Sequence, residues 1–326
     1  RAAIECANET PGPNTIRFNI DGGGAKTIFV ASTSGEELPF LRDAGTILDG
    51  TTQPGFGVGG DFRPLITLDG SQHEWRFPHN AIWVRADNTE IYGLEVKNFP
   101  DDGIDVYNAD NVTIGAAGRG NIIYNNGSQQ DVFPGFPGRW EGCSVVLREG
   151  ADNCQVQGNI IGTDRNRRAG IGSEFCGILN RSGANNNLIG GGANDANIIA
   201  FNPVGIRIDN STGVRIQQNE MYCNDTVAIQ LVRNANFNQP APVILAATVE
   251  EISGTAQPND RIEIYIADQN CAATPCQGRE LFGSATADAA GNWSVCFTTL
   301  NVISSCDDDT TAPIAICNAE ITVASD

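Results

Sequence analysis

The stretch "GIRIDNSTGVRIQQNEMYCND", residues 205–225, consists of three short segments that each end at Asn, Gly or Ser. Within a segment, Ile or Val alternates with polar residues, which predicts a strand with one apolar and one polar face. Each segment is too short to bury its own apolar residues. A unit of this kind becomes stable only when successive turns stack and share a core.

The same three segments recur upstream, as in "NVTIG" (111–115) and "NIIYNN" (121–126), and their first strands start at Gly103, Ser144, Gly177, Gly205 and Ala228. Asn and Gly at the corners supply positive φ and side-chain amides that bond the neighbouring turn. The pattern predicts an all-β chain built around a right-handed parallel β-helix with three short strands per turn. A β-propeller would need longer, antiparallel strands.

The two ends of the chain differ from this repeat. "RAAIECAN" (1–8) is helical in composition and is stopped by "PGP", so we expect a helix that caps the open edge of the first turn. From "VILAATVEEISGTAQPNDRIEIYIADQ" (243–269) onward, the strands are split by Gly, Asp and Pro turns. We therefore divide the chain into a β-helix domain (1–238) and a small β-sandwich domain (239–326).

Three segments carry a resemblance to a known family: "RAAIECANETPGPNTI" (1–16), "ILDGTTQPGF" (47–56) and "PLITLDGS" (64–71). They resemble secreted β-helix proteins of bacteria, frequent in Bacteroidota, that begin with a Ser-Leu-Arg-Glu-Ala type capping motif. The resemblance covers about residues 1–235, and "ADAAGNW" (287–293) is similar to the immunoglobulin-like modules that end such proteins. It implies a secreted or cell-surface protein, processed from a longer chain, and it implies no particular activity.

Net charge and the length of the apolar runs each exclude one class of partner. The chain has 20 Lys+Arg against 39 Asp+Glu, a net charge of −19, so it repels a phosphate backbone. No apolar run approaches the roughly 20 residues that a membrane span needs. We expect no nucleic-acid partner and no membrane insertion.

The ten cysteines form no CxxC pair and accompany only two histidines, which argues against zinc and favours disulfides in an oxidising compartment. Cys143 and Cys176 fall one turn apart in the same column, so their Cα atoms should lie within disulfide range. Cys271 and Cys276 bracket a short loop and are the second predicted pair. We interpret three others as buried apolar residues: Cys6, Cys154 and Cys223.

The candidate catalytic residues are the aspartates of "NFPDDGIDV" (98–106), namely Asp101, Asp102 and Asp105. Polysaccharide hydrolases need one carboxyl group as general acid and another to activate water. The residues level with Asp105 on other turns are not acidic, and no basic cluster is expected beside the aspartates. We therefore favour an aspartate that caps a turn. The five residues level with Asp105 are Trp83, Val146, Leu179, Arg207 and Gln230.

Three of these level residues, Trp83, Val146 and Leu179, are apolar although they face outward, so something must cover them. The insertion 127–140 is either a lid over them or a loop that stacks on sugars. The candidate ligand-binding aromatics are Trp83, Phe133, Phe136 and Trp140.

Two further clusters contain side chains of the kinds that bind metals. His73 and His79 are interpreted as aromatic packing. Asp307, Asp308 and Asp309 are either a calcium loop or an acidic loop tip. Calcium is the only cofactor considered.

Three functions remain open. The first is a non-enzymatic extracellular structural or adhesive protein, a subunit of a filament or a segment of a large adhesin, whose copies associate head to tail. The second is a polysaccharide hydrolase or lyase. The third is a carbohydrate-binding module. The lack of a stacked acid column favours the first.

Overall fold

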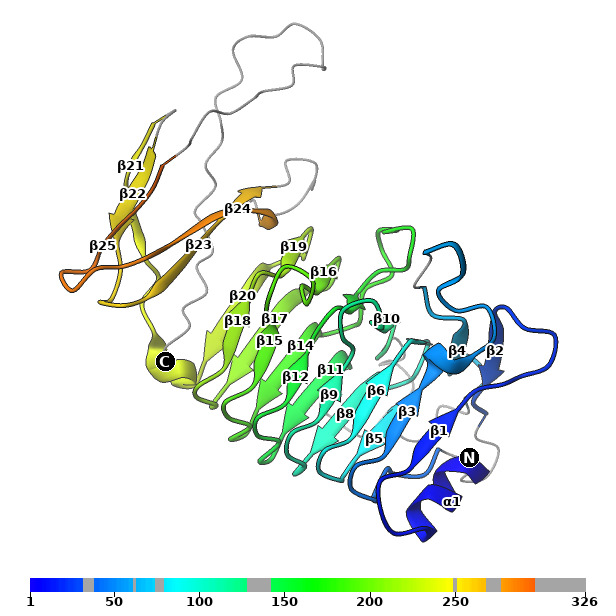
Figure 1. Cartoon of the computed structure of the whole chain (residues 1–326). Helices are drawn as coiled ribbons and strands as arrows, with labels where there is room; N and C mark the ends of the chain where they lie inside the picture. The colour runs from blue at the N-terminus through cyan, green and yellow to red at the C-terminus, as the bar shows by residue number, and fades with distance from the viewer. Residues whose placement is uncertain are drawn as a thin grey trace, which may run out of the picture.

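The computed structural model describes residues 1–31, 38–60, 63–73, 79–127, 142–248, 251–267 and 277–296. Within them the chain winds into a parallel β-helix whose turns stack along one axis, with two small antiparallel sheets after the last turn (Figure 1). The predicted fold class, a stacked parallel β-helix, is confirmed.

Three parallel sheets form the walls, with seven strands in each of the first two and six in the third, and a turn contributes at most one strand to each sheet. The first sheet contains β1 (Thr15–Arg17), β3 (Ile47–Asp49), β6 (Glu90–Tyr92), β9 (Thr113–Ile114), β12 (Gln155–Val156), β15 (Leu188–Gly190) and β18 (Arg215–Gln217). The second contains β2 (Lys26–Phe29), β4 (Ile66–Asp69), β7 (Leu94–Lys97), β10 (Ile122–Tyr124), β13 (Ile160–Ile161), β16 (Ile198–Ala200) and β19 (Glu220–Tyr222). The third contains β5 (Ile82–Val84), β8 (Ile104–Tyr107), β11 (Cys143–Arg148), β14 (Cys176–Arg181), β17 (Val204–Asp209) and β20 (Val227–Val232).

The register of the third sheet is the one that the sequence predicts. Asp105 pairs with Trp83 on one side and Val146 on the other, and the column continues through Leu179, Arg207 and Gln230. Alternation then sends the neighbouring Ile and Val residues inward. They form a single core along the axis, in which Ile104, Val106 and Ile178 are fully buried.

One corner of the β-helix carries a ladder of buried amides, formed by Asn121, Asn159, Asn197 and Asn219. Each side-chain amide donates to the carbonyl oxygen of the next, at 3.0, 3.0 and 2.8 Å. The same oxygens accept the backbone N–H of the preceding asparagine. Because each asparagine is at most 1% exposed, the ladder satisfies polar groups that would otherwise be buried without partners.

A helix, α1 (Ala2–Glu9), covers the first turn, as predicted. Ile4 and Ala7 are its buried residues and belong to the β-helix core. Cys6 lies on the opposite side of α1 and is exposed, so its interpretation as a buried apolar residue is wrong.

The region after the last turn contains two antiparallel sheets. One has the order β21 (Val243–Ala247), β22 (Glu251–Thr255), β25 (Asn292–Cys296), and the other pairs β23 (Arg261–Ala267) with β24 (Gly278–Thr286). Short 3₁₀ helices occur at Gly50–Thr52, Val58–Gly60 and Ala235–Asn238. The domain boundary at 238/239 and the immunoglobulin-like assignment remain predictions.

These C-terminal strands close the last turn. The Gln277 side chain accepts from the backbone N–H of Asn224 at 3.0 Å and donates to its carbonyl oxygen at 2.7 Å. Glu263 accepts from the backbone N–H of Gln218 at 2.9 Å. Hydrogen-bonding groups that the next turn would have used are therefore satisfied by side chains of the C-terminal sheets.

The predicted Cys143–Cys176 disulfide is present, with a Cα–Cα distance of 4.8 Å. Cys154 is a buried free thiol, as expected. Cys223 is disulfide-bonded and lies at positive φ in the turn after β19, so its interpretation as a buried apolar thiol is wrong. Cys271 and Cys276 lie outside the described residues.

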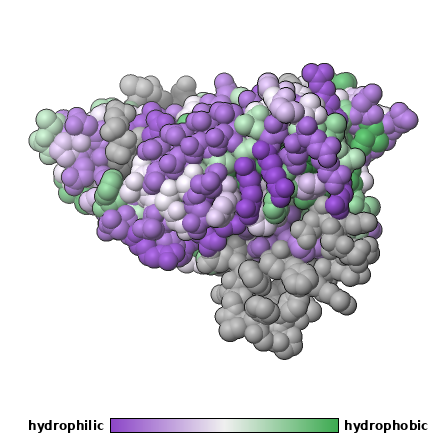
Figure 2. Space-filling view, turned by 90° about the horizontal axis from the view of Figure 1, so that it is seen from below, coloured by the Kyte–Doolittle hydropathy of each residue, from purple (hydrophilic) through white to green (hydrophobic). Residues whose placement is uncertain are grey.

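One face of the molecule is mostly hydrophilic. Figure 2 shows this face, on which hydrophobic residues occupy small areas between polar ones. Among the described residues, no helix is long and apolar enough to cross a membrane.

Candidate ligand-binding face

Aromatic and arginine side chains meet on the outer face of the third sheet, near the N-terminal end of the β-helix. Leu41 forms a parallel bridge with Val84, so residues 40–42 extend this sheet beyond β5. We call the resulting group the Arg–aromatic ladder; it consists of Phe40, Arg42, Trp83, Arg85, Tyr107 and Arg148.

The ladder is one continuous set of contacts. The rings of Phe40 and Trp83 lie 5.2 Å apart. The guanidinium of Arg85 lies 4.7 Å from the Phe40 ring, 5.5 Å from Trp83 and 4.6 Å from Tyr107. Arg148 lies 4.8 Å from Tyr107, and Arg42 lies 5.0 Å from Phe40. At these distances each cation is attracted to the electron-rich ring faces.

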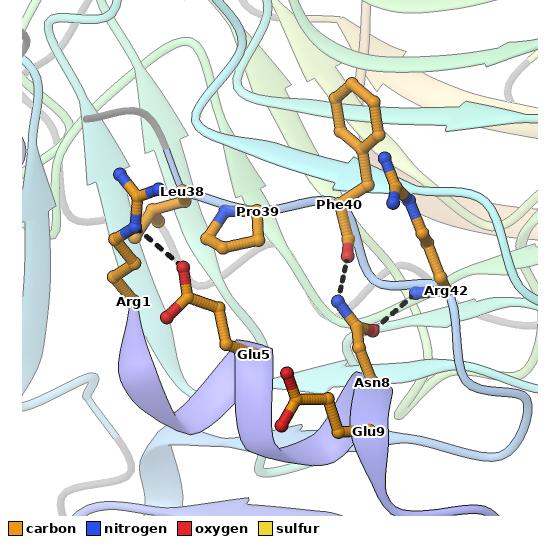
Figure 3. A pocket seen from close by; sticks show the side chains of 8 residues that line it. All are labelled: Arg1, Glu5, Asn8, Glu9, Leu38, Pro39, Phe40 and Arg42. Atoms are coloured by element: carbon orange, nitrogen blue, oxygen red, sulfur yellow. Dashed lines mark hydrogen bonds and ion pairs between the residues drawn. The ribbon is translucent and has the colours of Figure 1, made fainter. Parts of the chain in front are cut away.

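The N-terminal helix positions the first members of the ladder. The side chain of Asn8 donates to the carbonyl oxygen of Phe40 at 2.8 Å and accepts from the backbone N–H of Arg42 at 2.9 Å. Figure 3 shows the Phe40 and Arg42 side chains extending away from α1. A cleft of about 570 Å³ lies beside them, lined also by Arg1, Glu5, Glu9, Leu38 and Pro39.

Asp105 lies beneath the ladder and is fully buried. It accepts hydrogen bonds from Nε and Nη2 of Arg148, at 3.0 and 2.8 Å, and from Nδ2 of Asn80 at 2.8 Å. Burial alone would lower the pKa of Arg148, but the hydrogen bond and charge of Asp105 raise it. Asp105 thus fixes Arg148 in place.

Two expectations about Asp105 are therefore wrong. It lies within β8 rather than capping a turn. A basic residue does face it, because Arg148 stands two residues beyond Val146, its partner in the register, and reaches back across the strand.

Asp102 is buried at the start of the same strand. Its carboxylate accepts from the backbone N–H of Cys143 at 2.9 Å, and its own N–H donates to Asn80 at 2.8 Å. Burial, followed by the negative charges of Asp101 and Asp105, raises the pKa of Asp102 well above its usual value. Its hydrogen bond links two turns, which is close to the predicted capping role.

The outer face changes character beyond β8. Val146 and Leu179, each 1% exposed, form an apolar cluster with the Cys143–Cys176 disulfide. The expectation that these outward side chains are covered is confirmed. Trp83 is only partly buried. The insertion that carries Phe133, Phe136 and Trp140 lies outside the described residues.

The remaining candidates do not form a site in the described structure. The rings of His73 and His79 are both buried, with centroids 4.4 Å apart, and burial lowers the pKa of His79. No group of three His, Cys, Asp or Glu side chains suited to a metal ion occurs within the described ranges. Asp307, Asp308 and Asp309 lie outside them.

Sequence reasoning found Trp83 but missed its partners. It followed one outward position of each strand, the one that contains Trp83 and Asp105. The second outward position, two residues further on, holds Arg85, Tyr107 and Arg148. Side chains two residues apart in a strand point to the same face, so aligning this second outward position across the turns would have identified these three residues.

No protein-family model matches the chain, and neither does any curated protein. Among solved structures, the chain is similar to the A-module of the mannuronan C-5 epimerase AlgE4 of Azotobacter vinelandii, with 11% identity and a TM-score of 0.27, over 71% of this chain and 75% of that one. It is also similar to the Dettilon tailspike protein, with 9% identity and a TM-score of 0.21, over 90% and 86% of the two chains. Likeness this distant carries no argument about function.

Proposed function

We propose that the protein is a non-enzymatic, extracellular adhesive protein whose β-helix binds a polysaccharide along the Arg–aromatic ladder. The observation that carries this proposal is the continuous contact among rings and guanidinium groups on one outer face. Aromatic rings present a large rigid surface to the apolar faces of sugars, and arginine donates to their oxygens. The Cys143–Cys176 disulfide fits an oxidising, extracellular compartment.

Burial argues against catalysis by Asp105. A general acid or base must come within hydrogen-bonding distance of the substrate. Asp105 is 0% exposed and already bonded to Arg148 and Asn80, so a sugar cannot reach it without displacing them.

The test is a binding experiment with neutral and acidic polysaccharides, in which reducing ends and the absorbance of unsaturated products are followed at the same time. We expect saturable binding without release of product. Failure to bind any polysaccharide would refute the proposal, and release of product would refute its non-enzymatic part.

A second candidate is polysaccharide cleavage with Asp102 as general acid. It is favoured by the raised pKa of this carboxyl group, which is the direction that a general acid requires. In that case Asp102→Asn would abolish product release and leave binding intact. If the protein is adhesive and non-enzymatic, the unmodified protein releases no product, so the substitution cannot change product release.

Head-to-tail association of copies is also part of the proposal. Val243 and Leu245 are 53% and 68% exposed on β21, an edge strand of its sheet among the described residues. Such an edge can pair with a strand of a neighbouring molecule. Electron microscopy should then show fibres that Leu245→Lys abolishes. If the protein is a monomer at all concentrations, head-to-tail association is refuted. The β-helix is then a spacer within a single chain.

A further inference from the structure

Arg85 is an exposed cation whose contacts, among the described residues, are with aromatic rings and not with a carboxylate. Its guanidinium contacts three aromatic rings, those of Phe40, Trp83 and Tyr107. It forms no ion pair with an acidic side chain of the described residues. Arg42, next to it on the ladder, is likewise exposed and stacked on Phe40. No described residue accepts a hydrogen bond from either guanidinium group.

The absence of an ion pair distinguishes these two arginines from many other cations of this acidic chain. Ten of the basic residues in the described part of the chain form an ion pair with a carboxylate. Elsewhere on the molecule, Arg167 pairs with Glu220 and Arg261 with Glu263. Within the ladder itself, Arg148 is paired with Asp105. Among the described residues, Arg42 and Arg85 are therefore the arginines of the ladder that form no ion pair with a carboxylate.

Stacking also orients the two arginines before any ligand arrives. Contact with the aromatic rings restricts the motion of the guanidinium groups. A group that is already held in place loses less conformational freedom on binding. Planar guanidinium groups pair with carboxylate and with sulfate oxygens through two N–H bonds at once.

We infer that the ladder binds the acidic groups of an anionic polysaccharide, with Arg85 and Arg42 as the residues that contact them. This inference rests on the proposed polysaccharide binding and names the class of ligand. Arg42 and Arg85 stand on neighbouring strands, about 4.8 Å apart along the axis. A linear glycan lying parallel to the axis therefore places successive anionic groups over successive arginines.

The same anionic chemistry is supplied by a uronic-acid carboxylate or by a sulfate ester. Three probes separate the alternatives: polygalacturonate, a sulfated galactan and an unsulfated neutral galactan. We expect one acidic polymer to bind at least tenfold more tightly than the neutral one, and to lose affinity as salt is raised.

Variants then locate the contact. Arg85→Gln should weaken binding of the acidic polymer about tenfold, and Arg42→Gln should weaken it to a smaller degree, with unchanged melting temperatures. The matched control is Arg119→Gln, because Arg119 is also exposed and stacks on a tyrosine, Tyr92, at 3.8 Å but lies outside the ladder. It should bind like the unmodified protein.

Three results would overturn the inference. Equal affinity for neutral and acidic polymers would show that the ladder binds sugars without using charge, and the proposed function would stand. Equal losses in Arg85→Gln and Arg119→Gln would show that the anion binds through general charge rather than at the ladder. Absence of binding to all three probes would overturn the inference together with the proposed function.

Discussion

Two ladders run along the axis of this molecule, and they differ in whether their polar groups are already hydrogen-bonded within the protein or remain available to a ligand. In the asparagine ladder of Asn121, Asn159, Asn197 and Asn219, each amide bonds the next asparagine and backbone groups of neighbouring turns, and all four residues are buried. In the Arg–aromatic ladder, the side chains contact one another through ring faces and two arginines remain exposed.

The comparison separates stability from recognition. A hydrogen bond completed within the buried corner stabilises the fold, and its loss leaves groups without partners. A donor held in place at the surface but not consumed is available to a ligand. We therefore expect changes in the asparagine ladder to affect unfolding and changes in the Arg–aromatic ladder to affect binding.

The largest expected effect is that of Asn159→Ala. This change removes the partner of Asn121, of Asn197 and of the carbonyl oxygen of Ile114. Because buried groups lose their hydrogen bonds, we expect the free energy of unfolding to fall by about 3–5 kcal/mol. Denaturant unfolding measures this, with the exposed Asn19→Ala as control. A loss below that of the control would show that the ladder does not stabilise the corner.

The next effect concerns the covalent link between turns. Removing the Cys143–Cys176 disulfide by a double substitution to Ala should lower the free energy of unfolding by about 2–4 kcal/mol, since the bond closes a loop between residues that are 33 apart in sequence. Glycan affinity should not change, because the disulfide lies in the buried apolar cluster. Altered affinity in a folded variant would show that the two parts of the third sheet are coupled.

A smaller effect is expected for Trp83→Ala on binding. Trp83 contacts Phe40, Arg85 and Arg148, so its loss should raise the dissociation constant of the glycan about tenfold, in line with the energy of cation–π and stacking contacts. Phe237→Ala is the control, because Phe237 is an exposed aromatic residue outside the ladder. Titration calorimetry of both variants measures the difference. Equal affinities would remove Trp83 from the binding face.

The smallest effect is the pH dependence of Asp102. Burial and neighbouring acids raise its pKa in the folded protein above the usual 3.8. Between these two pKa values the folded state binds more protons than the unfolded chain, so the contribution of Asp102 to stability falls as the pH rises. Asp102→Asn should therefore gain stability relative to the unmodified protein at neutral pH, and this gain should disappear below about pH 4. A variant that is less stable at neutral pH would show that the carboxylate is needed in its charged form.

Much of the fold could be predicted because short strands with period-2 alternation leave few alternatives. The level residues of the third sheet, from Trp83 to Gln230, follow from aligning the repeated segments, and so does the contact between Cys143 and Cys176. The candidate site was predicted only in part. Trp83 was identified, but the arginines around it were missed because only one outward column was followed.

Other features depend on long-range contacts that have no local signal. Phe40 and Arg42 join the ladder because Asn8 of α1 bonds to their backbone, across more than thirty residues of sequence. The last turn is closed by Gln277 and Glu263, whose side chains accept from the backbone N–H groups of Asn224 and Gln218. Neither contact can be deduced from the periodicity of the segments that it joins.

The sequence by itself determined the repeating strand, its register and the direction of each side chain, because these follow from the alternation of apolar and polar residues over a few positions. Only the tertiary structure decided which outward side chains meet and which remain exposed. Val146 and Leu179 became buried, and Asp105 was paired with Arg148. Arg85 is exposed and has no ion pair among the described residues, although all five side chains stand on the outer face of the same sheet. The reason is that exposure depends on what packs against a face, and that is set by segments distant in the sequence.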